Sequence, residues 1–136
     1  GQTAVRDAVP WAGQTFVIVD NASGRVLSHT NGVLQLEDNT DRKGCWHWSC
    51  VEKDGWFGFC NTASGRYLGI NFWGVLQAEV THHLGWECFA TKRHPNGGYL
   101  LLVSTHGRLL TVGLNREGSL VANADIKGMV WEFVKV

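Results

Sequence analysis

The tetrapeptide Gly24-Arg25-Val26-Leu27 decides the fold, because closely similar tetrapeptides follow it at intervals of about forty residues. The later copies are Gly65-Arg66-Tyr67-Leu68 and Gly107-Arg108-Leu109-Leu110. A glycine followed by an apolar pair comes after each copy, in Gly32-Val33-Leu34-Gln35, Gly74-Val75-Leu76-Gln77 and Gly118-Ser119-Leu120-Val121. Each copy then ends on an aromatic segment: Trp46-His47-Trp48, Trp86-Glu87-Cys88-Phe89 and Trp131-Glu132-Phe133. This order predicts three tandem structural repeats.

Each repeat consists of strand and turn patterns. Phe16-Val17-Ile18-Val19 is aromatic and β-branched, and turn residues follow it up to Gly24. In Trp46-His47-Trp48 large apolar residues alternate with a polar one, which is typical of a half-buried strand. No apolar pattern with the helical period lasts for a normal helix length. Each repeat therefore predicts about four short strands.

The number of copies selects the architecture. Propellers with repeats of this length use four to eight blades, and open solenoids need atypical end repeats. Three similar four-stranded units can instead close into a barrel capped by hairpins, which removes sheet edges. The sequence therefore predicts an all-β protein, a single β-trefoil domain over residues 1–136. Its expected repeats are about 11–54, 55–96 and 97–136, after an N-terminal tail of residues 1–10.

The repeat pattern resembles that of fascin-like β-trefoils, in which a turn, Gly-Arg/Lys-x-Leu, a glycine with an apolar pair and Trp-x-Phe follow one another. It differs from the ricin-type group because Gln-x-Trp does not occur in this chain. The resemblance runs from about Trp11 to Val136. It implies a superfamily of actin-crosslinking proteins and carbohydrate-associated modules, so the fold follows from it more directly than the function does.

Composition limits the partners. The 12 basic residues equal the 12 acidic ones, so no overall field attracts nucleic acid or an anionic membrane. No apolar stretch is long enough to cross a bilayer. A local basic patch and the oligomeric state stay open. The partners we expect are a glycan or another small molecule, with actin or another protein as the alternative.

The cysteines and histidines do not predict a metal site, and we expect no cofactor. Cys45, Cys50, Cys60 and Cys88 lack a Cys-x-x-Cys pair. His82 and His83 are neighbours, and neighbours on a strand point to opposite faces, so they cannot easily share one ion. A domain of 136 residues does not need disulfides, which favours a cytoplasmic setting but does not exclude an extracellular one.

Features that recur in all copies are best assigned to the fold. Aligning the aromatic segments makes Trp46, Trp86 and Trp131 equivalent, and symmetric aromatics are expected in a shared core. The arginines of the repeated tetrapeptide are interpreted as structural as well, with long stems that cover apolar surface.

Features that differ between the copies are candidates for function. Phe72 and Trp73 form an aromatic pair beside Asn71 in a predicted loop, as a platform for a sugar ring would. A plug over the barrel mouth would have the same composition. Asp38 and Asn39, in the polar run from Glu37 to Lys43, are candidate partners for sugar hydroxyls. The segment that replaces this run in the second copy contains the further candidates His82 and His83.

These observations favour a non-catalytic, lectin-like carbohydrate-binding module. The chain has no Gly-x-Ser-x-Gly elbow, Walker loop or dinucleotide fingerprint, and we assign no catalytic residue. A protein-interaction module of the fascin type that binds actin is the alternative. An enzyme that uses the barrel mouth as its pocket is a third possibility.

Overall fold

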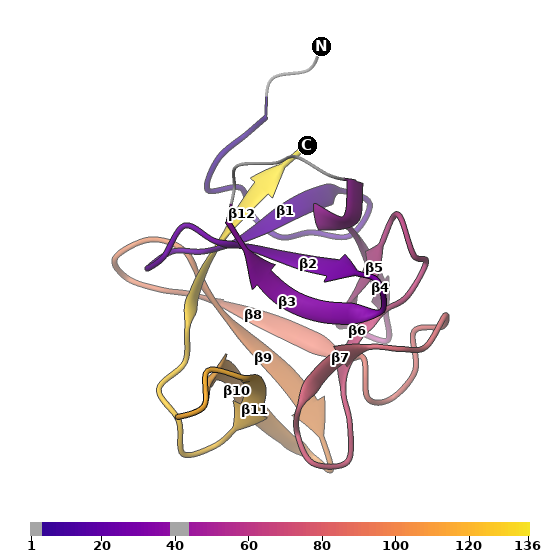
Figure 1. Ribbon diagram of the computed structural model, residues 1–136, viewed down its shortest axis with the longest axis vertical. Coiled ribbons are helices and arrows are strands. Elements are labelled where there is room, and N and C mark those ends of the chain that lie inside the picture. Colours follow the sequence, from indigo (N-terminus) through magenta and orange to yellow (C-terminus); the bar gives the residue numbers. More distant parts are fainter. Residues whose placement is uncertain (1–3, 39–43) are drawn as a thin grey trace.

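Among the described residues, twelve strands and one short 3-10 helix make up the fold (Figure 1). The computed structural model describes residues 4–38 and 44–136. The first unit contains β1 (Thr15–Asp20), β2 (Val26–Thr30), β3 (Val33–Glu37), the helix η1 (Gly44–Trp46) and β4 (His47–Lys53). The second contains β5 (Trp56–Asn61), β6 (Leu68–Ile70), β7 (Leu76–Ala78) and β8 (Phe89–Arg93). The third contains β9 (Tyr99–Thr105), β10 (Arg108–Leu114), β11 (Leu120–Asn123) and β12 (Val130–Lys135). No helix in these ranges is long and apolar enough to span a membrane.

Six of the strands close into a barrel. β1 pairs with β4, β4 with β5, β5 with β8, β8 with β9, β9 with β12, and β12 again with β1, all antiparallel. The remaining strands form three hairpins, β2–β3, β6–β7 and β10–β11. This arrangement of three four-stranded units is a β-trefoil, and it confirms the predicted fold class.

The backbone register corrects the predicted alignment of the tryptophans. The amide of Thr62 donates to the His47 carbonyl at 2.9 Å. Equivalent bonds run from Ser104 to Cys88 at 2.8 Å and from Asn21 to Val130 at 3.0 Å. The residue after each acceptor is therefore the equivalent one, which gives the set Trp48, Phe89 and Trp131. All three are fully buried.

Trp86 does not belong to this set, so its predicted core position is wrong. It lies three residues before Phe89, in the turn that precedes β8, and 36% of it is exposed. The counterpart of Trp46, two residues before the buried ring, is Glu87 in the second unit. Both Trp46 and Glu87 are buried, so the structural repeat keeps the position but not the residue type.

The middle of the barrel is filled by aromatic rings around Phe133. Phe133 meets Phe16 edge to face with ring centroids 5.6 Å apart, and it stacks on Phe59 at 5.8 Å. Phe59 in turn contacts Phe89 at 5.9 Å. Strands from all three units thus contribute to one core, so no unit buries its apolar face alone.

The segment before β1 is attached to β12. Val5 pairs with Lys135, and the amide of Ala8 donates to the Phe133 carbonyl at 2.8 Å. Arg6 binds the Glu132 carboxylate through two hydrogen bonds of 2.6 and 3.0 Å, and Glu132 also accepts the Asp7 amide at 2.9 Å. The Arg6 guanidinium holds the pKa of the Glu132 carboxyl below its usual range. Residues 5–8 of the predicted tail are therefore attached to β12 by an isolated bridge and by side-chain hydrogen bonds.

The four cysteines are free thiols. Cys50 pairs with Phe59 in the β4–β5 ladder and Cys60 pairs with Ser49, so the two thiols project from opposite faces of the sheet. Burial raises the pKa of the Cys50 thiol to about 12, which keeps it protonated and unreactive at neutral pH.

A buried asparagine fixes the turn between β5 and β6. The Asn61 amide nitrogen donates to the Cys45 carbonyl at 2.7 Å, and its oxygen accepts the backbone amides of Ala63 and Ser64, both at 3.1 Å. Asn61 is fully buried. Its side chain therefore satisfies three backbone groups that would otherwise lack partners near the core.

We expect Asn61→Ala to lower the free energy of unfolding by about 2 kcal/mol, because it leaves buried polar groups unsatisfied. Urea denaturation monitored by circular dichroism measures this loss. Thr62→Ala, at an exposed position of the same turn, is the matched control and should change stability by less than about 0.5 kcal/mol. Equal losses in both variants would contradict the role assigned to Asn61.

The Arg6–Glu132 pair predicts a loss of stability in acid. Because the pKa of Glu132 is lowered in the folded state, its contribution is complete above the ordinary glutamate value of about 4.3 and disappears as the pH falls through the lowered pKa. In urea denaturation from about pH 6 to about pH 3, the free energy of unfolding should decline less for Glu132→Gln than for the wild type. Glu117→Gln, at an exposed turn, should decline as the wild type does. Identical declines in all three proteins would show that the ion pair does not contribute.

Candidate functional site

The turn between β6 and β7 carries the predicted aromatic pair. The Asn71 side-chain oxygen accepts the backbone amides of Trp73 at 2.9 Å and Val75 at 3.0 Å. Asn71 also exchanges backbone hydrogen bonds with Val75 and Gly74, each of 3.0 Å. Gly74 has a φ of 77°, in the left-handed region that favours glycine. The turn is therefore held from both ends, and the residues at its tip have a defined position.

The third unit contains a turn of the same construction. The Asn115 oxygen accepts the amides of Glu117 at 3.1 Å and Ser119 at 2.9 Å, and Gly118 takes the place of Gly74. Asn71 is thus a structural residue of the turn. Its side-chain oxygen is used by the turn, and its Nδ2 group is the part that could donate a hydrogen bond to a ligand. At the tip, the third unit has Arg116 and Glu117 where the second has Phe72 and Trp73. The turn itself does not require aromatic residues.

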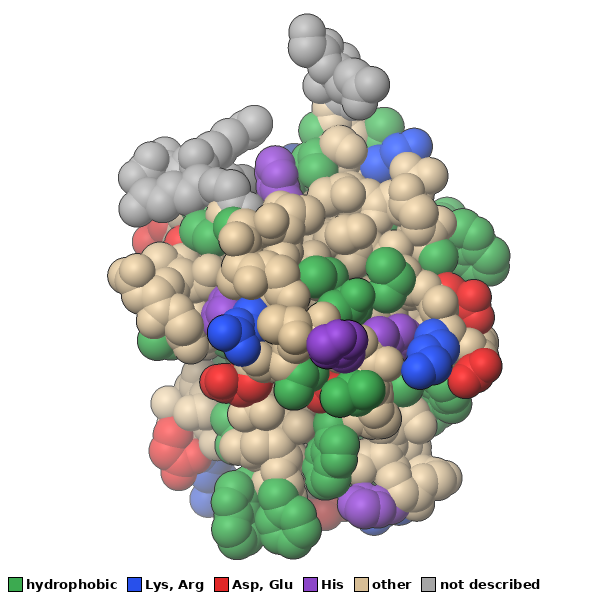
Figure 2. Space-filling model, turned by 90° about the vertical axis from the view of Figure 1, so that its right-hand side faces the viewer, with side chains coloured by type: hydrophobic (Ala, Val, Ile, Leu, Met, Phe, Trp, Pro, Cys, Tyr) green, Lys and Arg blue, Asp and Glu red, His purple; other side chains and the backbone are tan. Residues whose placement is uncertain are grey.

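Phe72 and Trp73 are the most exposed large apolar side chains of the described residues. Phe72 is 77% exposed and Trp73 is 82% exposed, so the pair is not a plug over the barrel. Their rings stand at 88° to each other with centroids 5.2 Å apart. Figure 2 shows hydrophobic side chains gathered at the lower end of this face of the molecule, with a histidine beside them. Such exposure of apolar rings on a fixed turn is typical of a binding surface.

Trp86 is a further exposed aromatic residue, and its backbone lies near this turn, whereas the sequence analysis assigned it to the core. Its carbonyl accepts the backbone amide of Ile70 at 3.2 Å, which places it alongside the end of β6 that leads to Phe72. Its indole meets the ring of His106 edge to face at 5.6 Å. The signal in the sequence was the spacing, since Trp86 lies three residues before Phe89, whereas Trp46 lies two residues before Trp48. We call Phe72, Trp73 and Trp86 the aromatic edge.

His82 and His83 are adjacent in sequence but differ in environment. His82 is exposed, and its Nδ1 atom lies 3.2 Å from the Thr81 hydroxyl. The His83 ring stacks on Tyr67 with an interplanar angle of 4°, and its Nε2 lies 3.8 Å from the Cys88 sulfur. Burial lowers the pKa of His83, so it is neutral at physiological pH. Within residues 4–38 and 44–136, no group of three or more His, Cys, Asp or Glu side chains is arranged to hold a metal ion.

The polar run after β3 has no described contact with the aromatic edge. Asp38 is exposed just beyond the end of β3, and Asn39 lies outside the described residues. Glu37, which starts the run, accepts the Trp46 indole N–H at 2.9 Å and the Gln35 amide at 2.8 Å. The Trp46 hydrogen bond in particular holds the pKa of Glu37 below its usual value. Glu37 therefore connects the first hairpin to η1, and no described contact joins this run to the aromatic edge.

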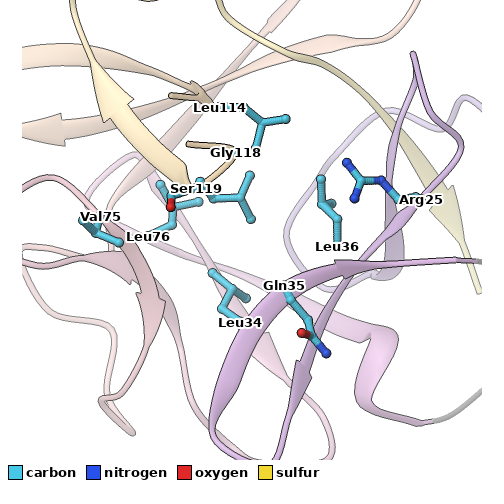
Figure 3. A pocket seen from close by; sticks show the side chains of 10 residues that line it. Arg25, Leu34, Gln35, Leu36, Val75, Leu76, Leu114, Gly118 and Ser119 are labelled. Atoms are coloured by element: carbon cyan, nitrogen blue, oxygen red, sulfur yellow. The ribbon is translucent and has the colours of Figure 1, made fainter. Parts of the chain in front are cut away.

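A separate hollow lies where the three hairpins meet. Figure 3 shows the side chains that line it, and its volume is about 360 Å³. We call it the cap pocket. Its lining consists of Arg25, Leu34, Gln35, Leu36, Val75, Leu76, Leu114, Gly118, Ser119 and Leu120. These ten described residues include no carboxylate and no histidine, so they offer neither a general acid nor a general base of the usual kinds.

Comparison with solved structures finds β-trefoil proteins of low sequence identity. The designed threefold-symmetric protein ThreeFoil is similar with a TM-score of 0.74 and 13% identity, over 90% of this chain and 99% of its own. SeviL, solved with an asialo-GM1 saccharide, has a TM-score of 0.68 and 15% identity, over 89% of this chain and 95% of its own. The GlcNAcα1-4Gal releasing endo-β-galactosidase from Clostridium perfringens has a TM-score of 0.75 and 16% identity, over 96% of this chain but only 34% of the enzyme.

At these identities the likeness shows the fold alone. No protein-family model matches the chain, and no curated protein matches it in sequence. The resemblance to fascin-like repeats therefore stays a prediction, and the β-trefoil fold is what the comparisons support.

The turn of the third unit suggests which residues can replace the aromatic pair without a loss of stability. We expect the double variant Phe72→Arg, Trp73→Glu, which copies Arg116 and Glu117, to keep a thermal midpoint within about 3 °C of the wild type, a shift equivalent to less than about 1 kcal/mol. The reason is that Asn71 and Gly74, which hold the turn, are retained. Differential scanning calorimetry measures the midpoint. A much larger drop would mean that the two rings stabilise the fold.

Proposed function

We propose that the protein is a non-catalytic carbohydrate-binding module whose ligand site is the aromatic edge. The observation that carries this proposal is the exposed Phe72–Trp73 pair, placed on a turn that forms equally well with charged residues in the third unit. These rings do not fill the core, and the turn does not need them. Exposed apolar side chains of this kind are typical of a ligand-binding surface.

The chemistry of the pair suits a sugar. A pyranose presents C–H groups on one face, and an exposed indole offers a rigid, flat apolar surface for that face with few rotatable bonds to restrict. Phe72 stands at 88° to Trp73, so it can close one side of a ring stacked on the indole. Asn71, whose side-chain oxygen accepts the Trp73 amide, offers its Nδ2 group for a hydroxyl group, and His106 offers polar atoms beside Trp86.

The fold comparisons agree with this choice of ligand class. SeviL was solved with a saccharide, and a region of an endo-β-galactosidase has the same fold as this chain. Because one fold serves many functions, this agreement supports the ligand class only at the level of the fold. The absence of acidic and histidine side chains from the described lining of the cap pocket supports a binding function over catalysis there.

We expect Trp73→Ala to weaken glycan binding about tenfold, since loss of a stacking ring removes about 1.4 kcal/mol. A glycan array that includes the asialo-GM1 saccharide identifies the ligand, and isothermal titration calorimetry with that ligand gives the affinities. Trp11→Ala is the matched control, because Trp11 is also exposed, at 65%, but packs on Phe57. Its affinity should equal that of the wild type.

Two results would contradict the proposal. One is a wild-type protein that binds no glycan on the array or at millimolar concentration in solution. The other is a glycan whose affinity is the same for Trp73→Ala and the wild type. If the protein instead sediments with actin filaments, the fascin-like alternative replaces the carbohydrate-binding one.

A further inference from the structure

The cap pocket exists because the three hairpins do not pack equally. β6–β7 and β10–β11 are joined by a bridge between Val75 and Val121 and by a hydrogen bond of 2.8 Å from the Ala122 amide to the Gly74 carbonyl. The first hairpin lies against β7 through β3, but no backbone bridge among the described residues ties it to either of the other hairpins.

Two apolar side chains of the first hairpin are less buried than their counterparts in the other two hairpins. The ladders place Leu36 in the position of Ala78 and Ala122, and Leu34 in the position of Leu76 and Leu120. The members from the second and third units are all buried, whereas Leu34 and Leu36 are only half-buried. Apolar side chains that the core leaves half-covered at a hollow can gain further burial from a ligand.

Arg25 is the only charged residue in the described lining of the cap pocket. In Figure 3 its guanidinium points toward Leu36 and the space between the hairpins, while the Gln35 side chain points away from Leu34. The Arg25 Nε group lies 3.3 Å from the Ser23 hydroxyl, and no described carboxylate forms an ion pair with Arg25. A guanidinium with free N–H groups binds a carboxylate through two parallel hydrogen bonds.

The arginines of the other two copies of the motif have different surroundings. By the hairpin ladders Arg66 takes the position of Arg25, whereas Leu110, and not Arg108, takes that position in the third unit. Arg66 donates from its guanidinium to the Glu79 carbonyl. Arg108 pairs with Thr105 at the two-residue turn between β9 and β10 and is exposed. Neither residue lines the cap pocket. Of the two arginines that share this ladder position, Arg25 lines the cap pocket and Arg66 does not.

We propose that the cap pocket binds a small amphipathic anion, namely an aliphatic carboxylate whose chain lies among Leu34, Leu36, Leu76 and Leu120 and whose head group binds Arg25. The volume of about 360 Å³ lies within the range of small-molecule sites. The charge of Arg25 selects an anion, and the five leucines of the described lining select an aliphatic body. This proposal does not depend on the carbohydrate-binding function, although Val75 follows the turn that carries the aromatic edge.

The test is titration of the full chain with hexanoate, octanoate and decanoate, followed by NMR of the leucine methyl groups and by calorimetry. We expect shifts at the methyl groups of Leu34, Leu36, Leu76 and Leu120, and an affinity that rises about fourfold for each added CH₂. Arg25→Gln should weaken decanoate binding about tenfold, because it removes a charge-assisted pair. Arg108→Gln, the matched control from the third unit, should leave the affinity unchanged, as should Trp73→Ala.

The neutral probe decanol tests the role of charge without a variant. In the wild type it should bind about tenfold more weakly than decanoate. Equal binding of decanol and decanoate, equal losses in Arg25→Gln and Arg108→Gln, or decanoate shifts outside the pocket would overturn the proposal. So would a glycan that binds the aromatic edge and shifts the same leucine methyl groups, because the hollow would then belong to the glycan site. If Arg25→Gln does not fold, the chain-length series and decanol still decide.

Discussion

The closed ladder of six barrel strands is the constraint on which the other features depend. One backbone bond, repeated as Thr62 to His47, Ser104 to Cys88 and Asn21 to Val130, sets the register of each unit. That register directs one large ring per unit into the core, and the Trp48 indole then donates to the Leu27 carbonyl at 3.1 Å. The barrel thereby holds the hairpins in place. Because all ladder bonds of the barrel are used internally, its hairpins and turns are the parts left to vary.

The architecture was predictable from the sequence because tandem landmarks report copy number directly. The register was not, because a one-residue shift in pairing leaves the composition of a segment unchanged. Trp86 shows the difference: its residue type matches Trp46, yet the hydrogen bonds align Glu87 with Trp46. The third unit departs in the same way, since Val112, and not Leu110, takes the ladder position of Leu27 and Leu68.

Comparison of the copies located part of the candidate site. Phe72 and Trp73 differ from Arg116 and Glu117, and that difference is visible in the sequence. The role of Asn71 is shared with Asn115, and it became clear only from the hydrogen bonds of the two turns. The cap pocket could not be found by such comparison, because three of its leucines, Leu34, Leu76 and Leu120, belong to the repeated apolar pairs. The pocket is asymmetric because the three hairpins, whose motifs are similar, pack with different tightness. That packing depends on neighbouring residues such as Ala78 and Ala122.

The attachment of the segment before β1 to β12 has a practical consequence for orientation. Val5 pairs with Lys135, so the two ends of the described chain lie together, at the top of Figure 1, while the β6–β7 turn is at the bottom. A tether at either end would therefore hold the molecule by the same side. On a bead, a sensor surface or a fusion partner, the protein would display its hairpins outward whichever end is coupled. Two copies joined tail to tail would point their aromatic edges away from each other, as a bivalent reagent requires.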